Sequence, residues 1–381
     1  MKQRSELLAF IILLLFNCKS TTIKTKDLNP KVISTINQVI AENNIPGLTF
    51  SIIHKNGQTD NYAAGFSDIE KKITLKTDHT FFSGSIGKTY TAALLMQLID
   101  KKQIELSDIF ITYFPGHEWL HQIPNIDDIT IGMLLQHTSG LPRYVLKPEI
   151  WKQIDEDPNK VWTYKDRLAV VFNDKPVHEA GKSWSYSDTN YILLGMLIEK
   201  VTKNNYYDLA DYQILKPYNL NQTYPSLKRN IPNLAVGYSK MPPAFRVPEK
   251  TVEAGSYFFN PQLEWTGGGM ASSTPNLAKW AKLYYSGTPF SKKTLATITT
   301  ENHNGHHVIG TDSYGIGTFI YETKHGKAFG HSGFMPGFNS LFIYYPELEI
   351  AAAIQINCDY AASVINMNEL MDDLISQSLI R

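Results

Sequence analysis

The chain has 381 residues, of which 43% are apolar and 12% aromatic, so it is long enough to bury one large core or two smaller ones. Basic and acidic residues balance at 36 each. This balance argues against a nucleic-acid-binding surface and against a strongly charged partner, and it leaves small neutral or zwitterionic substrates as candidates.

Residues 1–18 have the layout of an export signal. Two basic residues precede ten apolar residues at 7–16, a stretch too short to span a bilayer as a mature helix. Cys18 follows, and the polar residues 19–30 behind it resemble the tether of a bacterial lipoprotein. We expect lipidation of Cys18, with ordinary signal cleavage as the alternative. The expected location is therefore the periplasm or the outer membrane of a bacterium, with the lipid as the only membrane contact.

Residues 31–381 are expected to form a single domain. Apolar residues at helical spacing predict a helix over 31–44, and alternation around the turn Asn56-Gly57 predicts a hairpin over 47–68. The following signals are mainly helical and define a subdomain over about 89–220. Its predicted helices cover residues 91–103, 130–140 and 189–203.

The pattern returns to short β-strands after about residue 267. Four segments are rich in β-branched and aromatic residues and are separated by turn residues: 314–322, 326–334, 339–347 and 348–356. The last strand leads into Cys358, which we expect to be a buried, inert thiol. An amphipathic helix over 361–379 completes the chain.

This order of elements predicts an α/β (α+β) fold. An antiparallel sheet is flanked by the N- and C-terminal helices, and the mostly helical subdomain is inserted into it. The functional site is expected in the crevice between the two parts.

A candidate nucleophile lies at the start of the first helix of the subdomain. The letters Gly-Lys-Thr there do not make a phosphate loop, because Phe82 stands where the loop needs its first glycine. A G-x-S-x-G elbow is also excluded, because Ser83 takes the place of its first glycine. What remains is the S-x-x-K motif of Ser85 and Lys88.

The spacing of Ser85 and Lys88 suits a nucleophile and its base. Residues three apart share a helix face, so the lysine amine can reach the serine hydroxyl. A partly desolvated lysine near the positive end of a helix loses its proton more easily, and neutral Lys88 can then accept the proton of Ser85. The free N–H of Ser85 can point at a developing oxyanion. The alternative is coincidence, since about one or two S-x-x-K matches are expected by chance in a chain this long.

Two further segments of the chain carry residues that could assist Ser85 and Lys88. The first is residues 186–188. The phenol of Tyr186 can relay protons if a lysine lies near it, or else Tyr186 is a core residue and Asp188 caps the helix that follows.

The second segment is residues 331–334. Gly333 would let a substrate backbone approach, Phe334 could supply a second oxyanion N–H, and His331 and Ser332 could donate hydrogen bonds. The alternative for this segment is a glycine-rich hairpin.

A zinc site is the remote alternative. His117, Glu118 and His121 match H-E-x-x-H, which binds zinc only on a helix that turns both histidines to one ion. Prolines close to both ends of this segment leave room for barely two helical turns, and no third zinc ligand is evident. The loop 303–307 is expected to be a solvated turn. No metal or cofactor is therefore predicted.

Three short motifs in chain order carry a family resemblance: Ser85-x-x-Lys88, Tyr186-x-Asp188 and His331-x-Gly333. Together they resemble the active-site elements of the serine β-lactamase and penicillin-recognising family, in its class C, DD-peptidase and esterase branch. The stretches 129–144 and 267–287 are similar to this branch as well. The resemblance implies an acyl-enzyme mechanism without metal or cofactor, in which Ser85 attacks a carbonyl and Lys88 and Tyr186 share the base and acid roles.

Two positions depart from the family pattern. Asp188 stands where the family commonly has asparagine, so its carboxylate either favours the charged form of Lys88 or points away as a cap. His331 stands where β-lactamases usually have lysine, so a permanent cation for the antibiotic carboxylate is missing.

We therefore expect a DD-carboxypeptidase-like or D-aminopeptidase-like peptidase or an esterase of the bacterial envelope. It would act on a small molecule or peptide such as an acyl-D-amino acid, an ester or an amide. A class C-like β-lactamase and a non-catalytic penicillin-binding receptor are the alternatives. The loops 142–165 and 240–262 are expected to select the acyl group.

Overall fold

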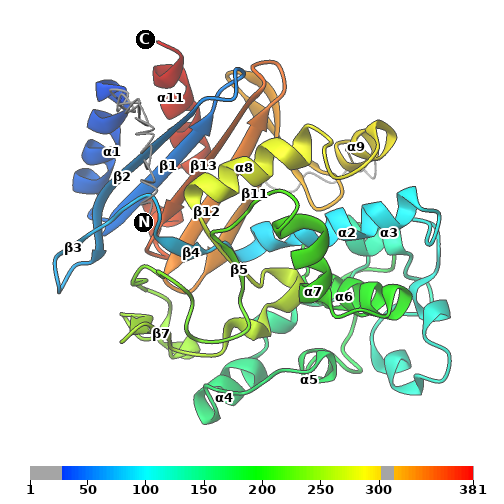
Figure 1. Ribbon diagram of the computed structural model, residues 1–381. Coiled ribbons are helices and arrows are strands. Elements are labelled where there is room, and N and C mark those ends of the chain that lie inside the picture. Colours follow the sequence, from blue (N-terminus) through cyan, green and yellow to red (C-terminus); the bar gives the residue numbers. More distant parts are fainter. Residues whose placement is uncertain (1–27, 302–312, 381) are drawn as a thin grey trace, which may run out of the picture.

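The fold is built on one large antiparallel sheet (Figure 1), seen in a computed structural model that describes residues 28–301 and 313–380. The strands of this sheet are β1 (Gly47–Ile53), β2 (Thr59–Asp68), β3 (Ile73–Thr74), β9 (Ser313–Tyr314), β10 (Phe319–Thr323), β11 (Gly326–Met335), β12 (Phe338–Tyr345) and β13 (Ile350–Ile356). Their order across the sheet is β3-β2-β1-β13-β12-β11-β10-β9. Strands from the start and the end of the chain thus share one sheet, which confirms the predicted fold class.

Strand β1 joins the portion of the sheet that comes from the start of the chain (β1–β3) to the portion that comes from its end (β9–β13). It pairs with β2 from Gly47↔Gly65 to Ile53↔Thr59, which is the hairpin predicted around Asn56-Gly57. On its other side β1 pairs with β13 over six residues. Every residue of β13 is buried, because helices cover both faces of the sheet there.

The two faces of the sheet carry different helices (Figure 1). Helices α1 (Pro30–Asn43) and α11 (Met367–Leu379) cover one face, and α8 (Thr274–Tyr285) covers the other. Alternate residues of β13 accordingly belong to two apolar cores: Ile354 packs with the terminal helices and Ala353 packs with α8 and the helical block.

The helical block separates the two portions of the sheet in the sequence. Its helices are α2 (Lys88–Asp100), α3 (Ile131–Leu135), α4 (Pro148–Glu156), α5 (Tyr164–Ala169), α6 (Asp188–Thr202) and α7 (Tyr206–Ala210), and α9 (Lys292–Ile298) follows α8. Two small sheets lie outside the large one. The first has the order β4 (Thr80–Phe82), β8 (Met270–Ser273) and β5 (Thr223–Pro225). In the second, β6 (Val252–Glu253) pairs with β7 (Ser256–Tyr257). Helices α2 and α6 are buried along most of their length, so their first residues lie inside the protein.

Two predicted helices are shorter than expected. The segment 130–140 is helical only over α3, because His137 and Gly140 take left-handed backbone angles with φ of 60° and 74°. The expected helix 361–379 is divided into α10 (Ala361–Val364) and α11. Asn366 makes the break, since its side chain accepts the first free N–H groups of α11.

Cys358 lies buried behind β13, and burial raises the pKa of its thiol to about 12. The thiol is therefore protonated and unreactive, as expected. The export signal, Cys18 and most of the tether lie outside the described residues. Within 28–301 and 313–380, none of the helices is long and apolar enough to cross a membrane.

Candidate active site

Ser85 lies in a 3₁₀ turn (Gly84–Gly87) that leads directly into α2. Strand β4 precedes the turn in the chain, and its last residue, Phe82, pairs with Ala271 of β8. This pairing holds the start of the turn in place. Ser85 itself is only partly buried. Ser85, the nucleophile expected from the sequence, is therefore accessible to solvent.

Lys88, the first residue of α2, is fully buried beside Ser85. Its Nζ donates to Ser85 Oγ at 3.1 Å, to Asp188 Oδ1 at 2.7 Å and to the carbonyl oxygen of Gly267 at 2.6 Å. An ammonium group has three N–H donors, and here each of them has one acceptor. The geometry thus fixes the position of Nζ next to the serine hydroxyl.

Asp188 is the first residue of α6, and its carboxylate is turned towards Lys88. Its second oxygen, Oδ2, accepts Nε of Arg143 at 2.9 Å and lies 2.8 Å from Nη2 of the same guanidinium. Asp188 therefore does not cap α6; Ser187 occupies the N-cap position. Burial alone would raise the pKa of Asp188, but the two cations outweigh it and hold that pKa below its usual range.

The charge state of Lys88 follows from this contact. Burial lowers the pKa of Lys88, but Asp188 and Tyr186 raise it by more, and the net pKa lies above its usual value. Lys88 is thus an ammonium in the resting site. Of the two possibilities that the sequence left open for Asp188, the structure shows the one in which its carboxylate contacts the amine and favours the charged form of Lys88.

Tyr186 lies over the same group, with its ring centroid 4.8 Å from Lys88 Nζ. Burial raises the pKa of Tyr186 above its usual value, although the nearby Lys88 lowers it in part. Within the described residues its buried hydroxyl has no hydrogen bond of ordinary geometry. The phenol is therefore protonated, and it is available to a group that enters the site.

Two residues of this site were missed in the sequence. His137 accepts the backbone N–H of Ser187 on Nδ1 at 3.1 Å, and its ring lies 4.1 Å from that of Tyr186. Arg143 stabilises Asp188 as described above. Both belong to the stretch 129–144 that resembles the family, but its helical pattern gave no sign that His137 would contact Tyr186 or that Arg143 would contact Asp188.

The backbone of β11 packs closely against the nucleophile turn. A Cβ on Gly333 would lie 1.9 Å from the carbonyl oxygen of Ser83, and a Cβ on Gly84 would lie 2.5 Å from the backbone nitrogen of Phe334. Glycine is required at both positions, and at Gly84 a φ of 52° adds to the requirement. The contact brings the N–H of Phe334 next to the turn that carries Ser85, as a two-donor oxyanion site needs.

His331 is buried and uses both ring nitrogens inside the protein. Its Nε2 lies 3.0 Å from the hydroxyl of Tyr314, and its Nδ1 donates to the carbonyl oxygen of Ser332 at 2.6 Å. Burial lowers the pKa of His331 to about 3, so the imidazole is neutral. The expectation that His331 donates a hydrogen bond to a substrate is thus corrected, because its donor is already engaged.

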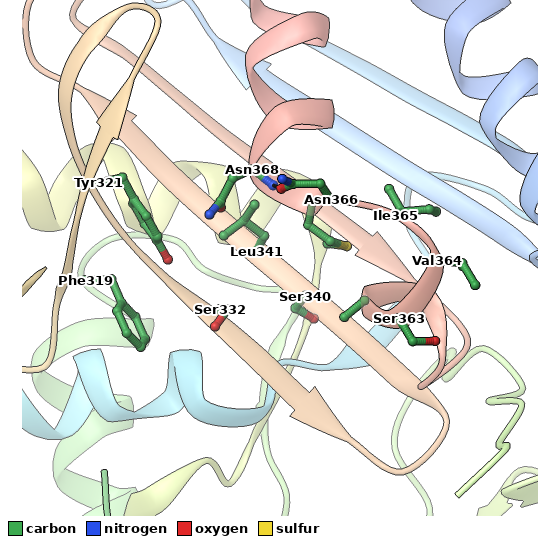
Figure 2. A pocket seen from close by; sticks show the side chains of 12 residues that line it. Phe319, Tyr321, Ser332, Ser340, Leu341, Ser363, Val364, Ile365, Asn366 and Asn368 are labelled. Carbon is green, nitrogen blue, oxygen red and sulfur yellow. Dashed lines mark hydrogen bonds between the residues drawn. The ribbon is translucent and has the colours of Figure 1, made fainter. Parts of the chain in front are cut away.

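Ser332 lies on the opposite face of the sheet, since successive side chains of a strand alternate. There it lines a cavity of about 640 Å³ between β10–β12 and the segment that joins α10 to α11 (Figure 2). Ser332 is therefore not a donor to a group bound at Ser85, which corrects the second expectation for this strand.

The H-E-x-x-H segment does not have the geometry of a zinc site. Residues Glu118–Gln122 form a 3₁₀ helix, in which residues four apart do not share a face. His121 contacts Asp127 at 2.8 Å, and His117 donates to the carbonyl oxygen of Pro115 at 3.3 Å. Among the described residues there is no group of three or more His, Cys, Asp or Glu side chains that could hold a metal ion. The loop 303–307 lies outside these residues.

Comparison with known proteins agrees with this geometry. The family model described as Beta-lactamase matches residues 32–375. Protein flp of Staphylococcus aureus (strain MRSA252) is 26% identical over 352 residues, which cover 90% of this chain and 66% of flp. Penicillin-binding protein 4* of Bacillus subtilis (strain 168) is 27% identical over 295 residues, 74% of this chain and 62% of that protein. The chain thus spans a little less than two thirds of the length of either relative.

Solved structures give the same result. A D-stereospecific amidohydrolase from Streptomyces sp. has a TM-score of 0.76 at 26% identity, with 88% of this chain and 95% of that chain covered. The D-amino acid amidase from Ochrobactrum anthropi SV3 has a similar fold, with a TM-score of 0.77 at 21% identity and coverage of 92% and 97%. With the family model matched over most of its length, the chain belongs to the β-lactamase family.

Proposed function

We propose that the protein is a serine hydrolase that forms an acyl-enzyme on Ser85 and acts as a DD-peptidase or amidase on derivatives of D-amino acids. One observation carries the proposal: the Lys88 amine lies 3.1 Å from Ser85 Oγ and is held there by a buried carboxylate and a backbone carbonyl. An activated serine needs a proton-transfer partner at this distance, itself oriented by a third group.

The proposed reaction has two steps. Ser85 Oγ attacks the substrate carbonyl carbon, and its proton passes through Lys88 and Tyr186 to the departing amine as the carbon–nitrogen bond breaks. The N–H groups of Ser85 and Phe334 stabilise the oxyanion. Water then attacks the ester carbon, gives its proton to the same pair and restores the Ser85 hydroxyl. Because Lys88 is charged at rest, one proton must leave the Lys88–Tyr186 pair before Ser85 can be deprotonated.

Two observations favour amides and peptides over β-lactams as substrates. His331 is neutral and fully engaged, so it offers no cation for the carboxylate of an antibiotic. The similar solved structures include enzymes described as a D-stereospecific amidohydrolase and a D-amino acid amidase. The second observation supports hydrolysis next to a D-residue.

Labelling with a fluorophosphonate tests the proposal. We expect the purified protein to gain one phosphonyl adduct and to hydrolyse p-nitrophenyl acetate, since an activated serine attacks both reagents. Tryptic digestion isolates residues 77–88, and fragment masses distinguish Ser85 from Ser83. An adduct without turnover would identify a penicillin-binding receptor instead, and an adduct on another residue would contradict the proposal. Inhibition by a chelator would point to the zinc alternative.

We also propose that the protein is exported and lipidated on Cys18, because residues 1–18 have the layout of a lipoprotein signal. In bacteria fed an alkyne fatty acid, the full chain is expected to incorporate the label in the membrane fraction. Cys18→Ser should abolish incorporation and release the protein. Equal labelling of both chains would contradict lipidation at Cys18.

A further inference from the structure

Tyr186, the proposed proton relay, lies in a segment without regular secondary structure. Residues 184–187 connect the turn at 180–183 to α6, so the position of the phenol is set neither by a helix nor by a strand pairing. A proton relay must nevertheless stay within reach of Ser85 and Lys88. Another contact therefore has to hold Tyr186 in place, and the contacts of His137 meet this need.

His137 accepts a hydrogen bond from each neighbour of Tyr186 in the chain. Its carbonyl oxygen accepts the backbone N–H of Ser185 at 2.9 Å, and its Nδ1 accepts the backbone N–H of Ser187 at 3.1 Å. The His137 ring also lies 4.1 Å from the Tyr186 ring, at an interplanar angle of 36°. One residue thus holds the backbone on both sides of the phenol and packs against the phenol ring itself.

The surroundings of His137 fix which ring nitrogen carries the proton. Nδ1 faces two donors, the N–H of Ser187 and Nδ2 of Asn190 at 3.2 Å, so it presents a lone pair. The amide of Asn190 is itself oriented, because its Oδ1 accepts the hydroxyl of Ser139 at 2.7 Å and its Nδ2 donates to the carbonyl oxygen of Leu134 at 3.1 Å. The neutral imidazole therefore carries its proton on Nε2.

His137 is not suited to exchange protons during the reaction. Burial lowers the pKa of His137 well below its usual value, and Lys88 lowers it further, so the ring stays neutral. The lone pair on Nδ1 is occupied by its two donors. The side chain is fully buried, and within residues 28–301 and 313–380 its Nε2 has no hydrogen-bond partner. His137 is therefore a positioning residue and takes no part as an acid, a base or a substrate contact.

Building on the proposed function of Ser85, we propose that His137 positions Tyr186 so that the phenol can give its proton to the departing amine. The decisive contact is the hydrogen bond from the N–H of Ser187 to Nδ1, because Ser187 directly follows Tyr186. Loss of this acceptor leaves a buried N–H unpaired and releases the segment that carries the phenol. A displacement of the acid by about 1 Å is enough to slow the reaction by about 100-fold.

Two substrates with the same acyl part test this role: D-alanine p-nitroanilide and D-alanine p-nitrophenyl ester. The departing nitroaniline needs a proton, whereas p-nitrophenolate leaves without one. For both substrates kcat/KM reports the acylation of Ser85. Tyr186→Phe should therefore lower kcat/KM for the anilide by roughly 10²- to 10⁴-fold and for the ester by less than about tenfold.

Variants of His137 should show the same selectivity when Nδ1 is lost. His137→Phe keeps a ring and should lower kcat/KM for the anilide by roughly 10- to 100-fold and for the ester by less than about threefold. His137→Gln reaches with its amide oxygen to the place of Nε2, so it also loses the acceptor and should show the same selective loss. It adds no apolar ring, and it carries the prediction if His137→Phe does not fold.

His137→Asn is the conservative variant that should restore the function. Its amide oxygen lies where Nδ1 lies in histidine and can accept the N–H of Ser187. Asparagine also tolerates the left-handed backbone of this position, where φ is 60°. We therefore expect kcat/KM of His137→Asn to stay within about fivefold of the intact chain on both substrates.

Tyr191→Phe is the matched control. Tyr191 is fully buried, its ring lies 5.4 Å from that of His137, and its hydroxyl donates to the carbonyl oxygen of Leu135 at 3.2 Å, away from residues 185–187. The variant removes a buried hydrogen bond beside His137 and should leave the ratio of anilide to ester turnover within about twofold. Fluorophosphonate labelling counts the active sites of each chain, so that rates are compared per labelled Ser85.

Three outcomes would overturn the inference while an intact adduct on Ser85 leaves the acyl-enzyme standing. An equal loss on both substrates in His137→Phe and His137→Gln, or no loss in either, would show that His137 does not act through the acid. A selective loss in His137→Asn as large as in His137→Phe would show that the acceptor is not the cause. Tyr186→Phe without a selective loss on the anilide would remove Tyr186 as the acid. Absence of both adduct and turnover in the intact chain would refute the proposed function, and the inference would fall with it.

Discussion

Ser85→Ala is expected to lower kcat for hydrolysis of an amide substrate by about 10⁴- to 10⁶-fold, the range found when a serine nucleophile is removed. The alanine side chain has no atom that can form the acyl-enzyme, and the oxyanion donors and the Lys88 amine cannot replace it. The residual rate would come from binding and from oxyanion stabilisation alone. Steady-state rates with D-alanine p-nitroanilide, together with loss of the fluorophosphonate adduct, measure the effect.

Ser83→Ala is the matched control for this variant. Ser83 lies two residues before Ser85 in the same turn region, but it is fully buried and its hydroxyl has no hydrogen-bond partner among the described residues. Its removal should change kcat by less than about threefold. Retention of the adduct in Ser85→Ala, or its loss in Ser83→Ala alone, would assign the nucleophile to another residue.

Asp188→Asn should move the ascending limb of the pH–rate profile to lower pH by about 1 to 3 units. The carboxylate raises the pKa of Lys88 in the intact site, and asparagine removes that charge while it keeps a hydrogen-bonding oxygen. A larger fraction of Lys88 is then neutral at pH 7 and can accept the proton of Ser85. The rate of acylation by p-nitrophenyl acetate between pH 5 and 10 would show the displacement.

The same variant should be less stable. Removing one partner of a buried ion pair leaves the other charge uncompensated, which costs about 3 to 5 kcal/mol unless the lysine gives up its proton. Arg143→Gln provides the opposite comparison. It removes a second cation from Asp188 and therefore should raise the pKa of Lys88 and move the limb to higher pH. A limb that does not move in Asp188→Asn would show that Lys88 is not the titrating group.

The nucleophile could be predicted from the sequence because it depends on the local spacing of two residues. Ser85 and Lys88 are three residues apart, and residues at that spacing approach each other whenever the chain begins a helix there. The 3.1 Å contact between their side chains is a consequence of this local rule. The hairpin at Asn56-Gly57 was readable for the same reason, because both depend on neighbours in the chain.

Contacts between residues far apart in the sequence could not be predicted from local spacing. Asp188 lies 100 positions and Gly267 lies 179 positions from Lys88 in the sequence, and their contacts arise only when α2, α6 and the turn before β8 pack together. The sequence left open whether Asp188 would cap a helix or contact the lysine, and packing decided for the contact.

The sequence by itself determined the residue types, the secondary-structure pattern and the pair of Ser85 and Lys88, because these depend on short-range periodicity. Only the tertiary structure decided the charge of Lys88, the engagement of His331 and the contact of Arg143 with Asp188. Charge states and free hydrogen-bonding groups depend on burial and on partners from remote segments. No local pattern of letters contains that information.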